Sequence, residues 1–594
     1  MIKEKKRSEI ALESKWDLST IYKGEKDVND DIKKAQLLLD DIKKYTNKIM
    51  DSSSNLLELI KKDLELDELF SKIYVYACMK LDEDMTNSFY QSLKGKIDNL
   101  KTLINSSTSF IVPELLKSDY NLVLQYIEEN KALEPFKKYL EEIFRYKDHT
   151  LSSKEERIIS SFSNLFKVGN SISSLICNSD LKLGTIKDEI ELTNSNFSLY
   201  ISSKDREVRK EAFDTMYKAY AGFKNTLAKT LASEVESNVT LANLKGYKNA
   251  LECALFADNI DETIYNNLIK TVNDNLNVLF KYYDLKKEVL GLDEMHLYDI
   301  YVDLIKTTDK TYSFLEGKNL IKQALSVLGE DYLKNIDKAF NENWIDIYPN
   351  EGKKSGAYSW GSYGTNPFVL LNYQGKLNDV STLAHELGHS MHSHYSHKFN
   401  DYQYASYSIF VAEVASTVNE LLLDYYLLAN SQSSEEKLTI LNNLMELYKG
   451  TIFRQTMFAE FEKEIYNKSS EGEVLTSEFL SNLYYDLNKK YFGSSVIVDE
   501  NIKYEWERIP HFYMFFYVYQ YATGLSAASH IVEGILNHKE NAVSDYLAFL
   551  KTGGSDYPVN ELKIAGVDIT NKEVIESAIK MFDDVIEQFK QLYN

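Results

Sequence analysis

Hydrophobic residues recur every three to four positions along most of this chain, which is the spacing of one face of an α-helix. The same spacing runs from about residue 27 to 190 and again from about 195 to 340, with a short strand-like interval at 181–192. Early examples of the recurrence are Leu37, Leu38, Ile42 and Tyr45, and Leu57, Ile60, Leu64 and Leu66. The pattern predicts a mainly α-helical protein.

The pattern changes between residues 343 and 375, where short apolar runs are separated by glycines. Residues 344–348 and 368–373 each predict a strand, and a glycine-containing loop lies between them. We therefore expect a small β-sheet at this place. Helical spacing resumes directly after it and continues to a final amphipathic helix at about 570–589.

Length and charge limit the class of protein. The chain has 594 residues, of which 44% are hydrophobic, and we expect two domains, residues 1–195 and 196–594. A net charge of −22 argues against nucleic acid or an anionic membrane as a partner, and no apolar run is long enough to span a bilayer. The three cysteines include no Cys-x-x-Cys pair, which favours a reducing environment. We expect a cytoplasmic protein that is a monomer or a weak homo-oligomer.

One predicted helix carries His385-Glu386-Leu-Gly388-His389, a His-Glu-x-x-His motif. Residues four apart lie about one turn apart, so the two imidazoles share a face and can bind one Zn²⁺. Glu386 is one position round, where a carboxylate can accept a proton from a water that the metal activates. Such a motif arises by chance in roughly 1% of chains of this composition. Gly388 has no side chain, so another element can approach the metal closely.

The third protein ligand has three candidates. His392 shares the helix face of the two motif histidines, but three ligands from one straight helix strain a tetrahedral site, which makes a hydrogen-bonding role more natural. Glu413 lies in an apolar, alanine-containing segment that is predicted to be a second helix. A carboxylate from a second helix completes a two-histidine site and leaves a position open, so Glu413 is preferred. Glu420, two turns further on, is the alternative.

An aromatic segment follows residue 509. Pro510 predicts the start of a helix that carries His511 and the tyrosines 517, 519 and 521. Hydrolysis of an amide builds negative charge on the carbonyl oxygen, and an imidazole or phenol donor can stabilise that charge. Three tyrosines at alternate positions of a helix cannot all face one cavity. The residue pattern leaves open which of these tyrosines act as donors to the carbonyl oxygen. Packing in the core is the alternative role for the others.

Several stretches along nearly the whole chain match one known pattern. They are Trp16-Asp-Leu18, Gly356-Ala-Tyr-Ser359, Pro367-Phe-Val-Leu-Leu-Asn372, His385-Glu-Leu-Gly-His-Ser-Met-His392, Phe410-Val-Ala-Glu413-Val-Ala-Ser416, Ile509-Pro-His-Phe-Tyr513, Tyr517-Val-Tyr-Gln-Tyr-Ala-Thr-Gly524, Gly553-Gly-Ser555 and Ala565-Gly-Val-Asp568. Together they resemble the oligoendopeptidase F group of the thimet-oligopeptidase-like zinc metallopeptidases. The extended metal motif and the Ile-Pro-His-Phe-Tyr motif are the most specific parts.

The resemblance implies a mainly α, two-lobed molecule, a helical shell with a deep substrate channel and a small sheet beside the zinc helix. It also implies the roles of particular residues. The implied zinc ligands are His385, His389 and Glu413, and the implied general base is Glu386. His511 and a nearby tyrosine are implied to bind substrate and transition state, with Tyr517 preferred and Tyr521 next.

We therefore expect a zinc-dependent endopeptidase that cuts short unstructured oligopeptides, by Glu-assisted attack of a water activated at the metal. An edge strand beside the metal can hold an extended peptide by adding it as another strand, although a purely structural hairpin is the alternative. The substrate contacts expected on the second strand are Phe368, Leu370 and Asn372. A peptide-binding protein with a structural or degenerate zinc site is the alternative function, but binding alone has no need of Glu386.

Overall fold

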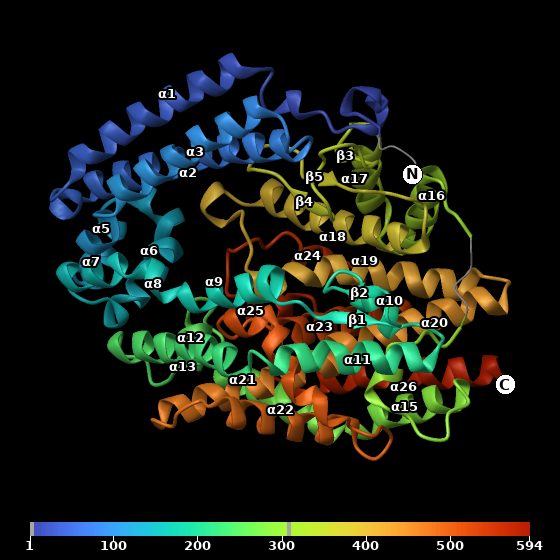
Figure 1. The fold of residues 1–594 in the computed structure, drawn as a ribbon. Coiled ribbons are helices and arrows are strands. Elements are labelled where there is room, and N and C mark those ends of the chain that lie inside the picture. Colours follow the sequence, from blue (N-terminus) through green and yellow to red (C-terminus); the bar gives the residue numbers. More distant parts are fainter. Residues whose placement is uncertain (1–4, 306–309) are drawn as a thin grey trace. The chain divides into compact units, whose positions relative to one another are not determined.

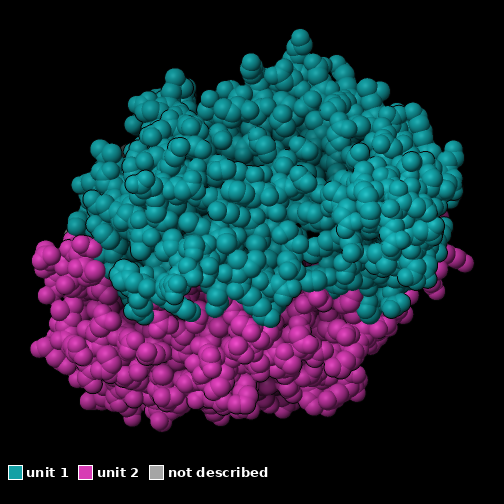
Figure 2. Space-filling model, turned by 180° about the vertical axis from the view of Figure 1, so that it is seen from behind, with its two compact units in different colours: residues 1–150, 310–426, 534–566 teal, residues 151–309, 427–533, 567–594 magenta. Residues whose placement is uncertain are grey.

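The computed structural model describes residues 5–305 and 310–594, and most of its regular structure is helical (Figure 1). The mainly α prediction is confirmed. Two compact units are present: residues 1–150, 310–426 and 534–566 form the first, and residues 151–309, 427–533 and 567–594 form the second (Figure 2). These units interleave along the sequence, whereas the predicted domains 1–195 and 196–594 are contiguous, and that division stays a prediction.

The first unit combines an N-terminal group of helices with a later group around a small sheet. In the later group, Asp379 caps the start of α18 (Leu377–Phe399) by accepting the N–H of Lys376 at 2.8 Å. The helices of this unit are α1 (Glu25–Ile42), α2 (Ser53–Asp82), α3 (Ser88–Thr108), α4 (Ile111–Leu116), α5 (Tyr120–Glu129), α6 (Lys137–Arg145), α16 (Phe314–Ala324), α17 (Glu330–Asn341), α18 (Leu377–Phe399), α19 (Ile409–Asn430, whose end passes into the second unit), α24 (Ala542–Phe549) and α25 (Pro558–Ile564).

The predicted small sheet is present beside α17 and α18, but it has three strands (Figure 1). They are β3 (Ile345–Asp346), β4 (Tyr358–Trp360) and β5 (Phe368–Leu370), in the order β3-β5-β4. β5 pairs in parallel with β3 and antiparallel with β4. The prediction that the second strand is an exposed edge is therefore wrong. The segment that follows the first turn returns as β4 and pairs with β5, so the edge strands of this sheet are β3, which is buried, and β4, which is half-exposed.

The second unit is helical apart from one hairpin. β1 (Gly184–Ile186) and β2 (Ile190–Leu192) pair antiparallel, which confirms the strand-like interval. Its helices include α7 (Ser153–Ser161), α8 (Ser163–Phe166), α9 (Val168–Leu175), α10 (Phe197–Ile201), α11 (Arg206–Ala221), α12 (Lys224–Leu244), α13 (Ala250–Phe256), α14 (Glu262–Asp274), α15 (Leu276–Val289), α20 (Ser434–Tyr448), the π-helix η12 (Lys449–Arg454), α21 (Gln455–Ser470), α22 (Ser477–Phe492), the 3₁₀ helices η13 (Glu500–Arg508) and η14 (Pro510–Tyr513), α23 (Tyr519–Leu536, whose end passes into the first unit) and α26 (Lys572–Tyr593).

The buried carboxylate of Glu505 in the second unit has several hydrogen-bond donors. Glu505, at 0% exposure, accepts hydrogen bonds from the phenols of Tyr217 at 3.0 Å and Tyr484 at 2.7 Å. Arg454, at the end of the π-helix η12, donates to the same carboxylate at 2.8 Å. A fully buried carboxylate needs such donors, because leaving it unpaired costs several kcal/mol, of the order of 3–5. Glu505 thereby fixes η13, the segment that leads into residue 511.

Among the helices that the structure describes, none combines the length and apolar character needed to cross a membrane. Cys78, Cys177 and Cys253 are free thiols.

Candidate active site

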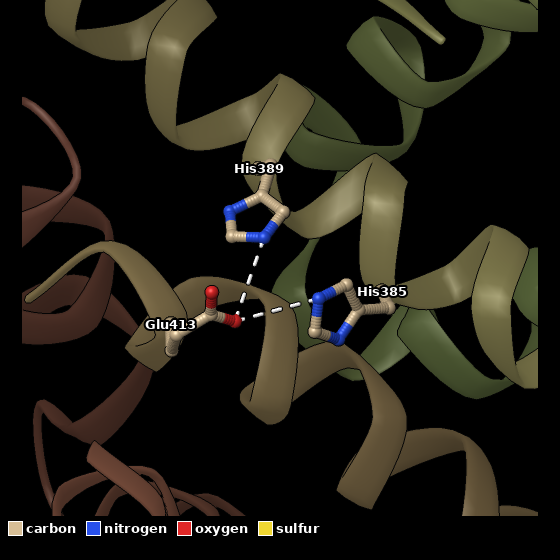
Figure 3. A group of neighbouring side chains, drawn as sticks. All are labelled: His385, His389 and Glu413. Carbon is tan, nitrogen blue, oxygen red and sulfur yellow. Dashed lines mark ion pairs between the residues drawn. The ribbon is translucent and has the colours of Figure 1, made fainter. Parts of the chain in front are cut away.

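Helix α18 brings the two motif histidines together as their spacing predicts. The rings of His385 and His389 lie 4.8 Å apart between centroids and are nearly perpendicular, at 82°. Figure 3 shows one nitrogen of each ring directed at the carboxylate of Glu413 on α19. The two helices therefore present three side chains to one point.

Gly388 explains how α19 comes so near. A Cβ atom at this position would lie 2.5 Å from the carbonyl oxygen of Ala415 and 2.5 Å from the Cα of Ser416. No side chain fits at those distances, so the backbones of α18 and α19 cross at this glycine. The close crossing is held by a hydrogen bond from the Asn419 amide to the carbonyl of Ala384, at 3.1 Å. The expectation that Gly388 admits a second element is confirmed.

Glu413 occupies the position expected of a third ligand. Its Oε2 atom lies 3.4 Å from Nε2 of His385 and 3.5 Å from Nε2 of His389. The three candidate ligand atoms all lie within 4.8 Å of one another, so one cation could bind to all three. Ser416 donates a hydrogen bond to the same Oε2 at 3.0 Å and fixes the carboxylate. Two imidazole nitrogens and one carboxylate oxygen form a donor set that suits Zn²⁺.

Glu420 lies behind the site and contacts the other nitrogen of His385. Its Oε2 is 3.1 Å from Nδ1 of that ring. Burial lowers the pKa of His385, but the hydrogen bond and charge of Glu420 raise it, and the resulting pKa is about 9. A carboxylate in this place orients a metal-ligating imidazole and makes it more basic. The sequence offered Glu420 only as an alternative ligand, since its spacing shows a shared helix face but not which nitrogen it meets.

Glu386 is almost fully enclosed, at 6% exposure. Its Oε2 has no hydrogen-bond partner among the described residues. Burial raises the pKa of Glu386 to about 7, against the lowering effects of His385 and of a hydrogen bond with the backbone of Ser359 on β4. A carboxyl group with such a pKa can both accept and return a proton near neutral pH. Sequence reasoning missed Ser359, although it lies in the matching Gly356-Ala-Tyr-Ser359 stretch.

His392 takes no part in the group formed by His385, His389 and Glu413, which we call the ligand group. Its ring is stacked on Tyr407, with centroids 3.7 Å apart and an angle of 6° between the planes. It is fully buried, and neither ring nitrogen has a hydrogen-bond partner in the described part of the chain. The expectation that it acts as a hydrogen-bonding neighbour is therefore wrong. His392 lies one turn beyond His389 on α18, at a place where the helix packs against aromatic side chains.

The side chains predicted to contact substrate on β5 are not available for that role. Phe368 and Leu370 have 0% exposure, and β5 is the middle strand of the sheet, so its backbone is also paired on both sides. The Asn372 amide donates to the backbone carbonyls of Lys354 at 3.0 Å and Gly356 at 2.8 Å. It therefore fixes the loop that leads into β4.

His511 belongs to the second unit, where it forms a cluster with two tyrosines. The ring of Tyr517 is stacked on it at 6.5 Å between centroids, and the phenol oxygen of Tyr521 lies 3.5 Å from its Nε2. Tyr517 and Tyr521 are also in contact with each other, at 5.4 Å and 86°. All three side chains are half-exposed, and burial lowers the pKa of His511. We call these three residues the His511 cluster.

The backbone that carries this cluster differs from the single helix that was predicted. Pro510 begins only the short 3₁₀ helix η14, and α23 begins at Tyr519, so Tyr517 lies in the connecting turn. The Tyr519 ring points away from the cluster and packs on Tyr265 at 5.0 Å, with 2% exposure. Tyr519 and Tyr521, two residues apart on α23, therefore face different ways, in agreement with the expectation that the three tyrosines cannot all face one cavity.

Comparisons with known proteins agree with this arrangement. The sequence model of peptidase family M3 matches residues 199–581, and a second model, described as oligopeptidase F, matches residues 114–182. The chain belongs to peptidase family M3. This M3 peptidase is 44% identical to oligopeptidase PepF of Bacillus subtilis over 590 residues, which cover 99% of this chain and 88% of that protein.

Two crystal structures extend the likeness to the fold of this M3 peptidase. A candidate peptidase from Chlamydophila abortus is 37% identical, with a TM-score of 0.93 and coverage of 99% of this chain and 100% of that one. The oligoendopeptidase-F of Enterococcus faecium is 32% identical, with a TM-score of 0.75 and coverage of 96% and 99%. The resemblance noted in the sequence is thus confirmed. The chain is a metalloendopeptidase, and its substrates are peptides.

Proposed function

We propose that this M3 peptidase is a zinc enzyme that hydrolyses internal bonds of short unstructured oligopeptides, with Glu386 as its general base. The convergence of His385, His389 and Glu413 on one point, with the Glu386 carboxyl enclosed beside them, carries the proposal. The three ligands would hold Zn²⁺, which supplies Lewis-acid polarisation of the scissile carbonyl and lowers the pKa of an attacking water.

Glu386 accepts the proton of the attacking water and returns it to the leaving amine. Its enclosure supports this role, since burial brings the carboxyl pKa to about 7 and allows both steps near neutral pH. Its position on α18, next to His385, keeps the carboxyl beside the ligands without making it one of them. Ser359 contributes a backbone hydrogen bond that orients it.

β4 is the element of this sheet that we propose holds the substrate backbone, in place of β5. Its free edge is available for a further strand, and its three residues are half-exposed. The hydroxyls of Ser359 on β4 and Ser390 on α18 share a hydrogen bond of 2.8 Å. This bond fixes the edge strand to the helix that carries His385 and His389. An extended peptide that adds to β4 gains backbone hydrogen bonds without requiring a particular side chain.

The His511 cluster is the proposed donor to the carbonyl oxygen that becomes negative. The family resemblance assigns such roles to His511 and a tyrosine, and the half-exposed ring of Tyr517 stacked on His511 supports it as the first choice. Tyr521, whose phenol approaches His511 Nε2, is the second choice. Donors of this kind typically contribute 10²–10³-fold to kcat.

An internally quenched peptide of nine residues and a folded protein, each with and without a zinc chelator, test the proposal. We expect cleavage of the peptide alone, loss of cleavage on chelation, and recovery when zinc is returned. Zinc content is measured in parallel. Stoichiometric zinc with peptide binding but no turnover would favour the alternative, a peptide-binding protein with a degenerate site. Cleavage of the folded protein at the same rate would contradict the restriction to unstructured substrates.

A further inference from the structure

The turn that carries Tyr517 has an unusual backbone. The N–H of Tyr517 donates to the carbonyl of Met514 at 2.8 Å, which closes a four-residue turn. Phe516 is the third residue of this turn and has a φ of +51°. Such a φ at the third position is characteristic of a type II turn and favours glycine, because a Cβ atom crowds the backbone there. A bulky residue keeps this conformation only when its surroundings impose it.

Glu462 supplies a contact that imposes it. This residue lies on α21 with 0% exposure, and its Oε1 accepts the N–H of Phe516 at 2.7 Å. Its Oε2 has no hydrogen-bond partner among the described residues. Burial raises the pKa of Glu462 well above its ordinary value, against the lowering effect of the hydrogen bond from Phe516.

Aromatic packing fixes the side chain of the same residue. The ring of Tyr466 lies 4.6 Å from that of Phe516 between centroids, and the ring of Tyr265 lies 5.6 Å away. Tyr466 follows Glu462 by one helical turn, so both project from one face of α21. One helix face therefore holds both the amide and the ring of Phe516.

A type I and a type II turn differ by a flip of their central peptide. Here that peptide joins Phe515 to Phe516, and its N–H is the group that Glu462 binds. An acceptor in this position selects one of the two orientations. Without that acceptor the strained φ of Phe516 can relax, and the backbone at Tyr517, the fourth residue of the turn and the residue that packs on His511, is then free to move.

We propose that Glu462 is a positioning residue, which holds the strained 514–517 turn through its contact with the Phe516 N–H and so keeps Tyr517 against His511. The proposal rests on the proposed function of the His511 cluster. Glu462 acts through the backbone and has no contact with substrate in this role.

Glu462→Gln and Glu462→Met test the proposal as a matched pair. The glutamine amide keeps a carbonyl acceptor, so we expect kcat within about twofold of the parent enzyme. Methionine has a similar size and no strong acceptor, and we expect kcat to fall about tenfold with little change in KM. Thermal unfolding confirms that both variants are folded. Equal activity of the two variants would overturn the proposal.

Two further backgrounds separate positioning from a general packing effect. Glycine adopts a positive φ without strain, so Glu462→Met should cost less than about threefold in Phe516→Gly. In Tyr517→Phe, Glu462→Met should add less than about twofold, since the group that it positions is absent. An undiminished loss in both backgrounds would overturn the proposal.

Hydrogen exchange of the segment 512–520 gives a readout that does not depend on catalysis. We expect Glu462→Met, but not Glu462→Gln, to accelerate exchange there at least tenfold. If Tyr517→Phe alone leaves kcat unchanged, the role given to Tyr517 fails, and exchange alone then decides whether Glu462 holds the turn. Unchanged exchange in Glu462→Met would overturn the inference whatever the activity.

Discussion

The ligand group and the His511 cluster are built in different ways. The three ligands come from two regular helices, and one glycine sets the distance between the helix backbones. The His511 cluster lies on a 3₁₀ helix, a turn and the first residues of an α-helix. In the first case the repeat of the helix brings the side chains together. In the second case a bulky residue at positive φ, fixed from another helix, determines where the ring of Tyr517 lies.

The difference shows what each region tolerates. In a site carried by helices, the spacing of residues along each helix determines which side chains share a face. Their relative positions therefore follow once the helix is identified. A turn-borne cluster depends on contacts from residues distant in sequence, such as Glu462. We therefore expect changes at the ligand group to abolish binding or chemistry, and changes around the His511 cluster to reduce the rate by degrees.

Glu386→Gln should have the largest effect on activity. The amide cannot accept the proton of the attacking water, so kcat should fall by about 10²–10⁴-fold, the range of general acid–base catalysis. Zinc content, measured by mass spectrometry, should stay at that of the parent enzyme, because Glu386 is not a ligand. Glu58→Gln, at an exposed position of α2, is the control and should be unchanged. A Glu386→Gln variant with zinc and full activity would contradict the mechanism.

Gly388→Ala should separate the two ligand helices. The added Cβ would meet the α19 backbone at 2.5 Å, and relief requires movement of the whole helix. We expect a loss of about 1–3 kcal/mol in the free energy of unfolding and weak zinc binding. Gly95→Ala in α3 meets no atom within 4 Å and should leave stability equal or higher. Tight zinc binding by Gly388→Ala would show that α19 is not held by this contact.

Glu420→Gln should weaken the metal site without removing a ligand. It takes the charge from the group that orients His385 through Nδ1, and such substitutions typically cost 10–100-fold in metal affinity. Competition with a chelator measures that affinity. The structure predicts that Glu413→Gln lowers metal affinity more than Glu420→Gln does. The reverse order would mean that Glu420 is itself a ligand.

Tyr517→Phe and Tyr519→Phe distinguish the exposed cluster from the core. Loss of the Tyr517 phenol should lower kcat about tenfold or more, with KM nearly unchanged, because a donor to the developing charge is removed. Tyr519 is buried against Tyr265 and its phenylalanine variant should keep kcat. Steady-state kinetics on one quenched peptide measure both. Equal losses would mean that Tyr517 serves packing, as Tyr519 does.

The helix-borne part of the molecule could be predicted from the sequence for a physical reason. The spacing of His385 and His389 fixes their common face, and Gly388 indicates a close crossing before any partner helix is known. The sheet was misjudged because strand order depends on a third segment, 358–360, too short to give a pattern of its own. The turn at Phe516 was missed because phenylalanine gives no signal of a positive φ. The stacking of His392 was missed because Tyr407, its partner, lies outside α18. The spacing of residues along that helix therefore gives no information on where the Tyr407 ring lies.

His392→Phe should have the smallest effect on catalysis. Phenylalanine preserves the stacking on Tyr407, and zinc binding should be retained because His392 is not a ligand. Stability of the metal-free protein should change in its pH dependence. Burial lowers the pKa of His392 to about 3, below its ordinary value near 6.5, so the unfolded chain binds more protons between these values. The stability of the parent protein therefore falls as pH drops below 6.5.

Removal of this histidine should lessen that fall by up to about 1.4 kcal/mol per pH unit, while stability at pH 8 changes little. Urea unfolding of both chelated proteins at pH 8 and pH 5 measures the difference. Since the phenylalanine ring binds no proton, the variant should lose less stability between the two values than its parent. Loss of zinc from His392→Phe would return this histidine to the ligand group, and an equal acid sensitivity would mean that its ring is already protonated in the fold.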